Sequence, residues 1–193
     1  MLILLNTSRA VATLALMLLA TRPVLAHNEA PKLSDETAIY QLVLSEAPAH
    51  VDKSLVVPMT TVPSTEIIRT LGYAIPAKTR HNLPAGLLSN FANRNRTPSA
   101  LPRLQSKVPL IYVTRGDLDR IFKLGFWEAF HKTYHNASGT AEFSRPGFAR
   151  NNTVALVYFT HSEAGLSGSG DIYYLVKVSG HWKIKRRLGG WVS

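Results

Sequence analysis

The chain has 193 residues, no cysteine, and 22 lysines and arginines against 12 aspartates and glutamates, which gives a formal net charge of +10. The absence of cysteine excludes disulfides, thiol catalysis and zinc sites built from cysteine. The positive charge favours anionic partners, although charge by itself does not define a site.

Residues 1–26 are predicted to be a cleavable signal peptide. Arg9 precedes an apolar run from Ala10 to Ala20, and small residues up to Ala26 supply a signal-peptidase site. The run of about 11 apolar residues is too short for the roughly 20 that span a bilayer, and Arg22 closes it. We therefore expect export and not a membrane anchor.

Residues 27–193 are long enough for one domain that buries its own core. Removing residues 1–26 takes away two arginines and no acidic residue, so the net charge falls from +10 to +8. A small eukaryotic secreted domain would usually carry disulfides, so a cysteine-free exported chain favours a bacterial source. We expect a basic, periplasmic or secreted domain that is not an integral membrane protein.

Two helices are predicted in the first half of this domain. Residues 34–47 begin with Ser34 and Asp35, either of which is suited to capping, and place apolar side chains at helical spacing. Residues 84–95 show the same spacing, with Pro84 in the first helical turn.

Between and after these helices the sequence predicts a strand and a surface connection. Residues 54–62 are apolar and β-branched but contain Pro58, which suits an edge strand better than a central one. Residues 94–109 are basic and rich in proline, which is typical of a connection over the surface.

The middle of the chain predicts a short strand and a long helix. Residues 110–114 form the strand candidate, and residues 116–135 follow with Asp117 as a candidate cap. Aromatic residues recur along this helix at core spacing: Phe122, Phe126, Trp127, Phe130 and Tyr134.

The last third changes to the period of strands. Residues 153–160 and 171–178 are β-branched and aromatic, and residues 181–188 alternate apolar and basic side chains. Ser179 and Gly180 supply a two-residue hairpin turn. The predicted class is α+β, with N-terminal helices packed on a C-terminal antiparallel β-meander.

Several stretches of the chain resemble a family of exported bacterial proteins to which no function is assigned. The stretches are GFWEAFHKTYHNASG, FSRPGFARNNTVALVYFTH, GLSGSG and YYLVKVSGHWKIKRRLGGWVS, with a looser likeness at LVVPMTT and LPAGLLSNFANRN. The meander that ends in WKI also resembles the end of nuclear-transport-factor-2-like and cystatin-like folds. The resemblance implies export and brings no activity, ligand or catalytic residue with it.

The segment HSEAGLSGSGD, residues 161–171, is predicted to be a connection between two strands. Gly165, Gly168 and Gly170 would tolerate the positive φ that such connections require. The spacing fits neither the nucleophile elbow nor the phosphate-binding loop. A carboxylate pair across the mouth of the loop, Glu163 and Asp171, is the catalytic alternative.

A hydrolase is the alternative to a binding domain, and its candidate residues are the weak set His131, His135, His161, Glu163 and Asp171. Two of these histidines, four residues apart on one predicted helix, could share a metal. The metalloprotease signature needs a glutamate where this chain has Lys132, so we expect neither a metal site nor a cofactor.

Two basic segments are the strongest candidates for a binding function. On the last strand, strict alternation would place Lys183, Lys185 and Arg187 on one outward face. The other segment covers residues 94–107. No nucleic-acid motif accompanies the charge, so anionic lipid or polysaccharide is the expected partner and nucleic acid is not. The sequence thus predicts a noncatalytic exported domain that binds an anionic envelope component or a small ligand, and it leaves the oligomeric state open.

Overall fold

The computed structural model describes residues 33–47, 53–63, 65, 67 and 75–193. In these residues the helices are α1 (Leu33–Leu44), α3 (Ala77–His81), α4 (Leu87–Arg94) and α5 (Arg115–Thr133). The strands are β1 (Ser54–Pro58), β2 (Leu110–Val113), β3 (Ala137–Phe143), β4 (Gly147–Phe148), β5 (Val154–Ala164), β6 (Ser167–Val178) and β7 (His181–Val192).

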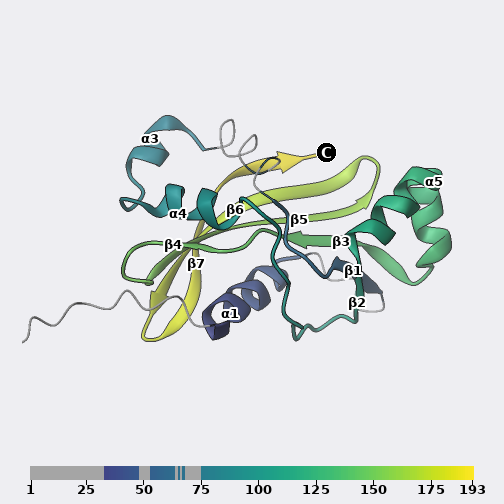
Figure 1. Ribbon diagram of the computed structural model, residues 1–193, viewed down its shortest axis with the longest axis horizontal. Helices are drawn as coiled ribbons and strands as arrows, with labels where there is room; N and C mark the ends of the chain where they lie inside the picture. Colours follow the sequence, from purple (N-terminus) through teal and green to yellow (C-terminus); the bar gives the residue numbers. More distant parts are fainter. Residues whose placement is uncertain (1–32, 48–52, 64, 66, 68–74) are drawn as a thin grey trace, which may run out of the picture.

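All seven strands join one sheet (Figure 1). The strand order is β2-β1-β3-β5-β6-β7, and β4 pairs with β5 beside this path. β1 is parallel to both β2 and β3, whereas the pairs from β3 onward are antiparallel. The long strands β5, β6 and β7 therefore form the predicted antiparallel meander.

Alternate side chains of β5 point to opposite faces of the sheet and build two separate cores. Ala155, Val157 and Phe159 pack in the core that contains α1. Leu156 and Tyr158 pack in the core that contains α4. The sheet is therefore covered on both faces at its centre.

The helix α5 covers the β1 and β2 end of the sheet on the face opposite α1. Val56 of β1 packs with Leu118 and Phe130 of α5, whereas its neighbours Leu55 and Val57 lie in the α1 core. Because successive strand residues point to opposite faces, α1 and α5 lie on opposite sides of the sheet. The predicted α+β class, with helices packed on a C-terminal meander, is confirmed.

The turn between β6 and β7 has the conformation that its sequence predicts. Ser179 and Gly180 both adopt positive φ, 49° and 81°. This pair of angles matches the right-handed twist of the flanking strands. The hairpin prediction is confirmed.

Two predictions about proline are wrong. The strand that contains Pro58 is not at the edge of the sheet but lies between β2 and β3, with all five of its residues buried. Pro58 is tolerated there because it is the last residue of β1. Pro84 does not start α4, which begins at Leu87 after Gly86, an N-cap with φ of 78°.

The long aromatic helix α5 differs from its prediction at both its start and its middle. Its N-cap is Thr114, whose hydroxyl oxygen accepts the N–H of Asp117, so Asp117 is not the cap. The helix is interrupted at Gly125 and at Phe126, where φ is 51° and ψ is −129°. Phe126 therefore leaves the buried aromatic stripe and is 57% exposed.

The predicted signal peptide, residues 1–26, lies outside the described residues. Within the described part of the chain, every helix is too short or too polar to cross a membrane.

Candidate functional site

The glycine-rich segment 161–171 joins two strands, as predicted, but most of it is itself strand. Only Gly165 and Leu166 lie between β5 and β6. The three glycines of the segment do not have positive φ, and the prediction that they supply it is wrong. Close packing explains two of them, because a Cβ on Gly168 would lie 2.8 Å from Ser162 Oγ and one on Gly170 would lie 2.3 Å from Trp191 Nε1.

The structure brings three of the five hydrolase candidates together at the end of β5. His161 Nε2 lies 3.8 Å from Glu163 Oε1. His131 Nε2 lies 3.2 Å from the Glu163 carbonyl oxygen, which accepts its N–H. The His161 side chain faces the interior and the residue is only 3% exposed, so a substrate has little access to its imidazole.

The other two candidates lie apart from this group. α5 ends at Thr133, so His135 sits in the following turn and does not share a helix face with His131. Among the described residues, no group of three histidine, aspartate or glutamate side chains could hold a metal ion. The predicted pairing of these two histidines on one helix is therefore wrong.

Asp171 has a structural partner on the neighbouring strand. Its Oδ2 lies 3.5 Å from Arg187 Nη1, and Arg187 Nη2 lies 3.1 Å from Glu46 Oε2 of the segment after α1. The Arg187 guanidinium also lies over the ring of Tyr173, whose pKa burial raises to about 12. This cluster ties β6 and β7 to α1, and Asp171 does not face Glu163 as a catalytic partner.

The basic residues of β7 do not form one stripe. Ile184 pairs with Leu175 and Arg186 pairs with Tyr174, so Lys185 is an extra residue at a β-bulge. The bulge reverses the alternation, and the predicted common face of Lys183 and Arg187 is wrong. Their role in binding stays a prediction.

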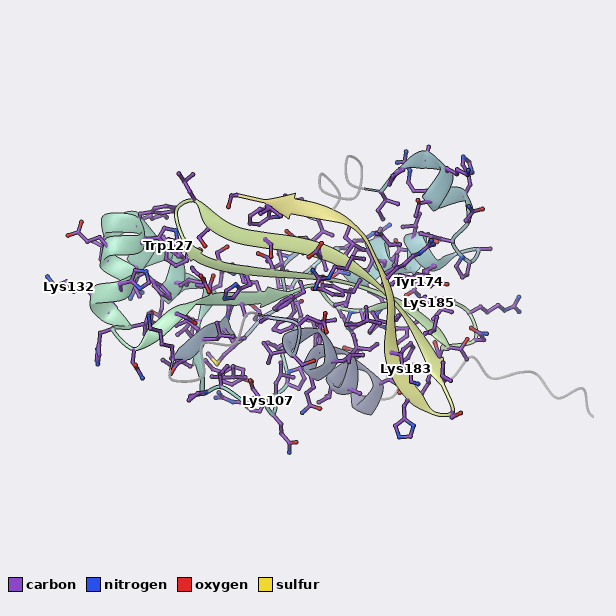
Figure 2. All side chains as sticks on the ribbon, turned by 180° about the vertical axis from the view of Figure 1, so that it is seen from behind. Lys107, Trp127, Lys132, Tyr174, Lys183 and Lys185 are labelled. Carbon is purple, nitrogen blue, oxygen red and sulfur yellow. The ribbon has the colours of Figure 1, made fainter. Side chains whose placement is uncertain are left out.

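A cavity of about 350 Å³ opens between the end of α1 and the segment 105–108. Its floor is apolar and includes the buried residues Leu44, Leu55 and Val108. Its rim is polar and carries one cation: Gln41, Ser45, Gln105, Ser106 and Lys107. Figure 2 shows Lys107 well apart from Lys183 and Lys185 of β7.

The segment 105–108 forms one wall of this cavity, and hydrogen bonds fix the position of this wall. The N–H of Leu55 donates to the carbonyl of Pro109 at 2.9 Å, and the N–H of Val108 donates to Ser106 Oγ at 3.2 Å. The N–H of Leu104 donates to the hydroxyl of Tyr112 at 2.7 Å. The bonds of Leu55 and Leu104 join the loop to β1 and β2, and the bond of Val108 lies within the loop.

Most acidic side chains of the described residues are neutralised within the fold. Ion pairs join Asp35 to Lys177, Glu36 to Arg94 and Arg145, Glu46 and Asp171 to Arg187, Asp117 to Arg120, and Glu142 to Arg115. In the same part of the chain, the exposed residues Lys107, Lys183 and Lys185 have no carboxylate within ion-pair distance. The excess positive charge is therefore displayed to solvent.

The cavity was not predicted from the sequence. The charge of residues 94–107 and the helix of residues 34–47 were both visible in the sequence, but no pattern indicated that these two segments meet in space. Comparisons with protein-family models, with curated proteins and with solved structures found no match.

Proposed function

We propose that the chain is an exported, noncatalytic binding domain whose ligand is a small anionic amphiphile of the bacterial envelope. The observation that carries this proposal is the cavity beside Lys107, with its apolar floor and polar rim. Its volume of about 350 Å³ lies within the range of small-molecule sites, roughly 300–1,000 Å³.

The chemistry of the cavity fits a ligand with two unlike ends. Leu44, Leu55 and Val108 offer an apolar surface to a short acyl or alkyl chain. The Lys107 ammonium offers a charge to a carboxylate or phosphate, and the amides of Gln41 and Gln105 offer further hydrogen bonds. A neutral or cationic head group would lack the main polar interaction.

The charge distribution and the N-terminal sequence support an anionic ligand met outside the cytoplasm. Most acidic side chains of the described residues are paired with basic ones, so the excess positive charge of the chain favours anionic ligands. The basic residue and apolar run within residues 1–26 support export to the periplasm or the medium.

The alternative, a hydrolase, has less support from the geometry. Its three converging residues are His131, His161 and Glu163, and the most central of them is 3% exposed. A general base must come within hydrogen-bonding reach of the substrate proton that it removes. The buried position of His161 instead fits a residue that stabilises the end of β5.

Isothermal titration calorimetry with decanoate and decyltrimethylammonium, both below their micellar concentrations, tests the proposal. The two probes share a chain and differ in the sign of the head group, so decanoate should bind more tightly than the cationic probe. Lys107→Gln should weaken decanoate binding roughly two- to fivefold, the range expected for a solvent-exposed charge pair.

The matched control is Lys78→Gln, which removes an exposed lysine on α3. Ser45→Trp, which places an indole in the cavity, should abolish decanoate binding while the thermal transition stays cooperative. Equal binding of both probes, or equal effects of Lys107→Gln and Lys78→Gln, would contradict the proposal.

A further inference from the structure

Two protruding internal segments, which we call tips, lie side by side at the end of the molecule opposite the β6–β7 turn. One is the interruption of α5 at Leu124, Gly125 and Phe126, and the other is the β5–β6 turn at Gly165 and Leu166. A Cβ on Gly165 would lie 3.6 Å from Phe126 Cε1, so the two tips are in contact. Figure 1 shows α5 bending beside the end of the β5–β6 hairpin.

The two tips expose large apolar side chains together. Leu124 is 77% exposed, Phe126 57% and Leu166 87%. Single exposed apolar residues are normal on protein surfaces, whereas exposed apolar residues that gather from two segments are typical of a surface that contacts a partner. We call Leu124, Phe126 and Leu166 the apolar tip.

The backbone holds the apolar tip outward at a conformational cost. Phe126 has φ of 51°, a rare value for a bulky residue and one that persists only where the surroundings enforce it. The enforcing contacts are aromatic: the Phe122 ring lies 5.4 Å from that of Phe126 and 5.2 Å from that of Trp127, and Trp127 lies 5.0 Å from the buried Phe130. Phe126 thus packs against the aromatic rings of α5 on one side and stays 57% exposed on the other.

The exposed charges around the apolar tip do not by themselves favour an anionic surface. Lys123 and Lys132 are exposed on α5, as are the carboxylates Asp119 and Glu128, so the local charge is close to balanced. Attraction to an anionic surface therefore comes from the whole exported domain, because residues 27–193 carry a formal net charge of +8. Figure 2 shows Trp127 and Lys132 together at this end of the molecule.

We propose that the apolar tip inserts into the interfacial region of an anionic lipid bilayer. The tip is a protrusion and not a groove, so it suits a deformable partner into which side chains can sink. Aromatic rings beside apolar side chains, with lysines next to them, are the combination found at membrane interfaces. The excess positive charge of the chain adds attraction to anionic lipid.

The first test compares partition of the full chain onto vesicles of phosphatidylglycerol and phosphatidylethanolamine. Leu124→Asp combined with Leu166→Asp should lower the partition coefficient at least about tenfold, because two apolar side chains no longer enter the bilayer. Val178→Asp is the matched control, since Val178 is 45% exposed on the other hairpin. The control should partition onto vesicles like the unsubstituted chain. The double variant should bind decanoate like the unsubstituted chain.

The second test uses the absence of cysteine in the chain. Leu166→Cys labelled with an environment-sensitive fluorophore should show a blue shift with anionic vesicles and a smaller one with phosphatidylcholine vesicles. The same label on Val178→Cys should not respond. An unresponsive label at position 166 would overturn the proposal. So would a dimer that forms without vesicles and that Leu166→Asp dissociates, because another copy of the chain would then cover the apolar tip.

Discussion

Gly170 of β6 pairs with Trp191 of β7, and the Trp191 side chain lies close against it. The indole N–H of Trp191 donates to the hydroxyl of Tyr158 at 2.9 Å directly above it. A Cβ at Gly170 would lie 2.3 Å from Trp191 Nε1 and 2.6 Å from the Tyr158 hydroxyl. The glycine is therefore required by packing and not by a turn conformation.

Gly170→Ala should lower the free energy of unfolding by roughly 1–3 kcal/mol, the usual effect of overfilling a packed interior. Gly165→Ala is the control and should change it by no more than about 0.5 kcal/mol. The nearest atoms to a Cβ at Gly165 are ring carbons at 3.6 and 3.7 Å, which is ordinary contact. Urea denaturation measures both values, and a loss at Gly165 equal to that at Gly170 would show that packing is not the reason.

The start of α5 is stabilised by a reciprocal contact between Thr114 and Asp117. The Thr114 hydroxyl lies 2.6 Å from Asp117 Oδ2, and the Asp117 N–H donates to the same hydroxyl oxygen at 3.1 Å. The hydrogen bond from Thr114, together with the positive charge of Arg120, lowers the pKa of Asp117 below its ordinary value of 3.8. Charged Asp117 therefore stabilises the folded state.

Asp117→Asn should lower the melting temperature at pH 7, and this effect should become smaller as the pH falls below the ordinary pKa of 3.8. A carboxyl whose pKa is depressed by folding stabilises the protein above its unfolded pKa, and this stabilisation is lost as pH falls through the folded pKa. Melting curves at pH 7, 5, 4 and 3 measure the difference, with Asp119→Asn as the control. The same loss of melting temperature at pH 7 and at pH 3 would exclude the charge as the cause.

The elements that the sequence predicts well are those with strong periodic patterns. β5, β6 and β7 are long, β-branched and aromatic, and Ser179 and Gly180 define the turn between the last two. β3 was not predicted because small residues such as Gly139 and Ala141 give no strand pattern. Gly139 is nevertheless required by packing, because a Cβ at this position would lie 2.0 Å from the carbonyl oxygen of Ser162. The interruption of α5 was missed because a single glycine, Gly125, is tolerated within a helical pattern.

The candidate site depends on the arrangement of the whole molecule. β1 lies between β2 and β3, so the loop that precedes β2 is brought beside the end of α1. Gln41 and Lys107 meet only through this topology, which local propensity does not encode. The charge of the segment 94–107 was visible in the sequence, whereas the apolar floor that makes it a cavity was not.

Backbone amide NMR spectra during titration with decanoate test the central claim, that the cavity beside Lys107 binds a small anionic amphiphile. We predict saturable shifts at the cavity residues Gln41, Ser45, Gln105 and Lys107, and no comparable shifts with decyltrimethylammonium. Absence of saturable shifts, or shifts centred on Lys183 and Arg187 of β7, would contradict the claim.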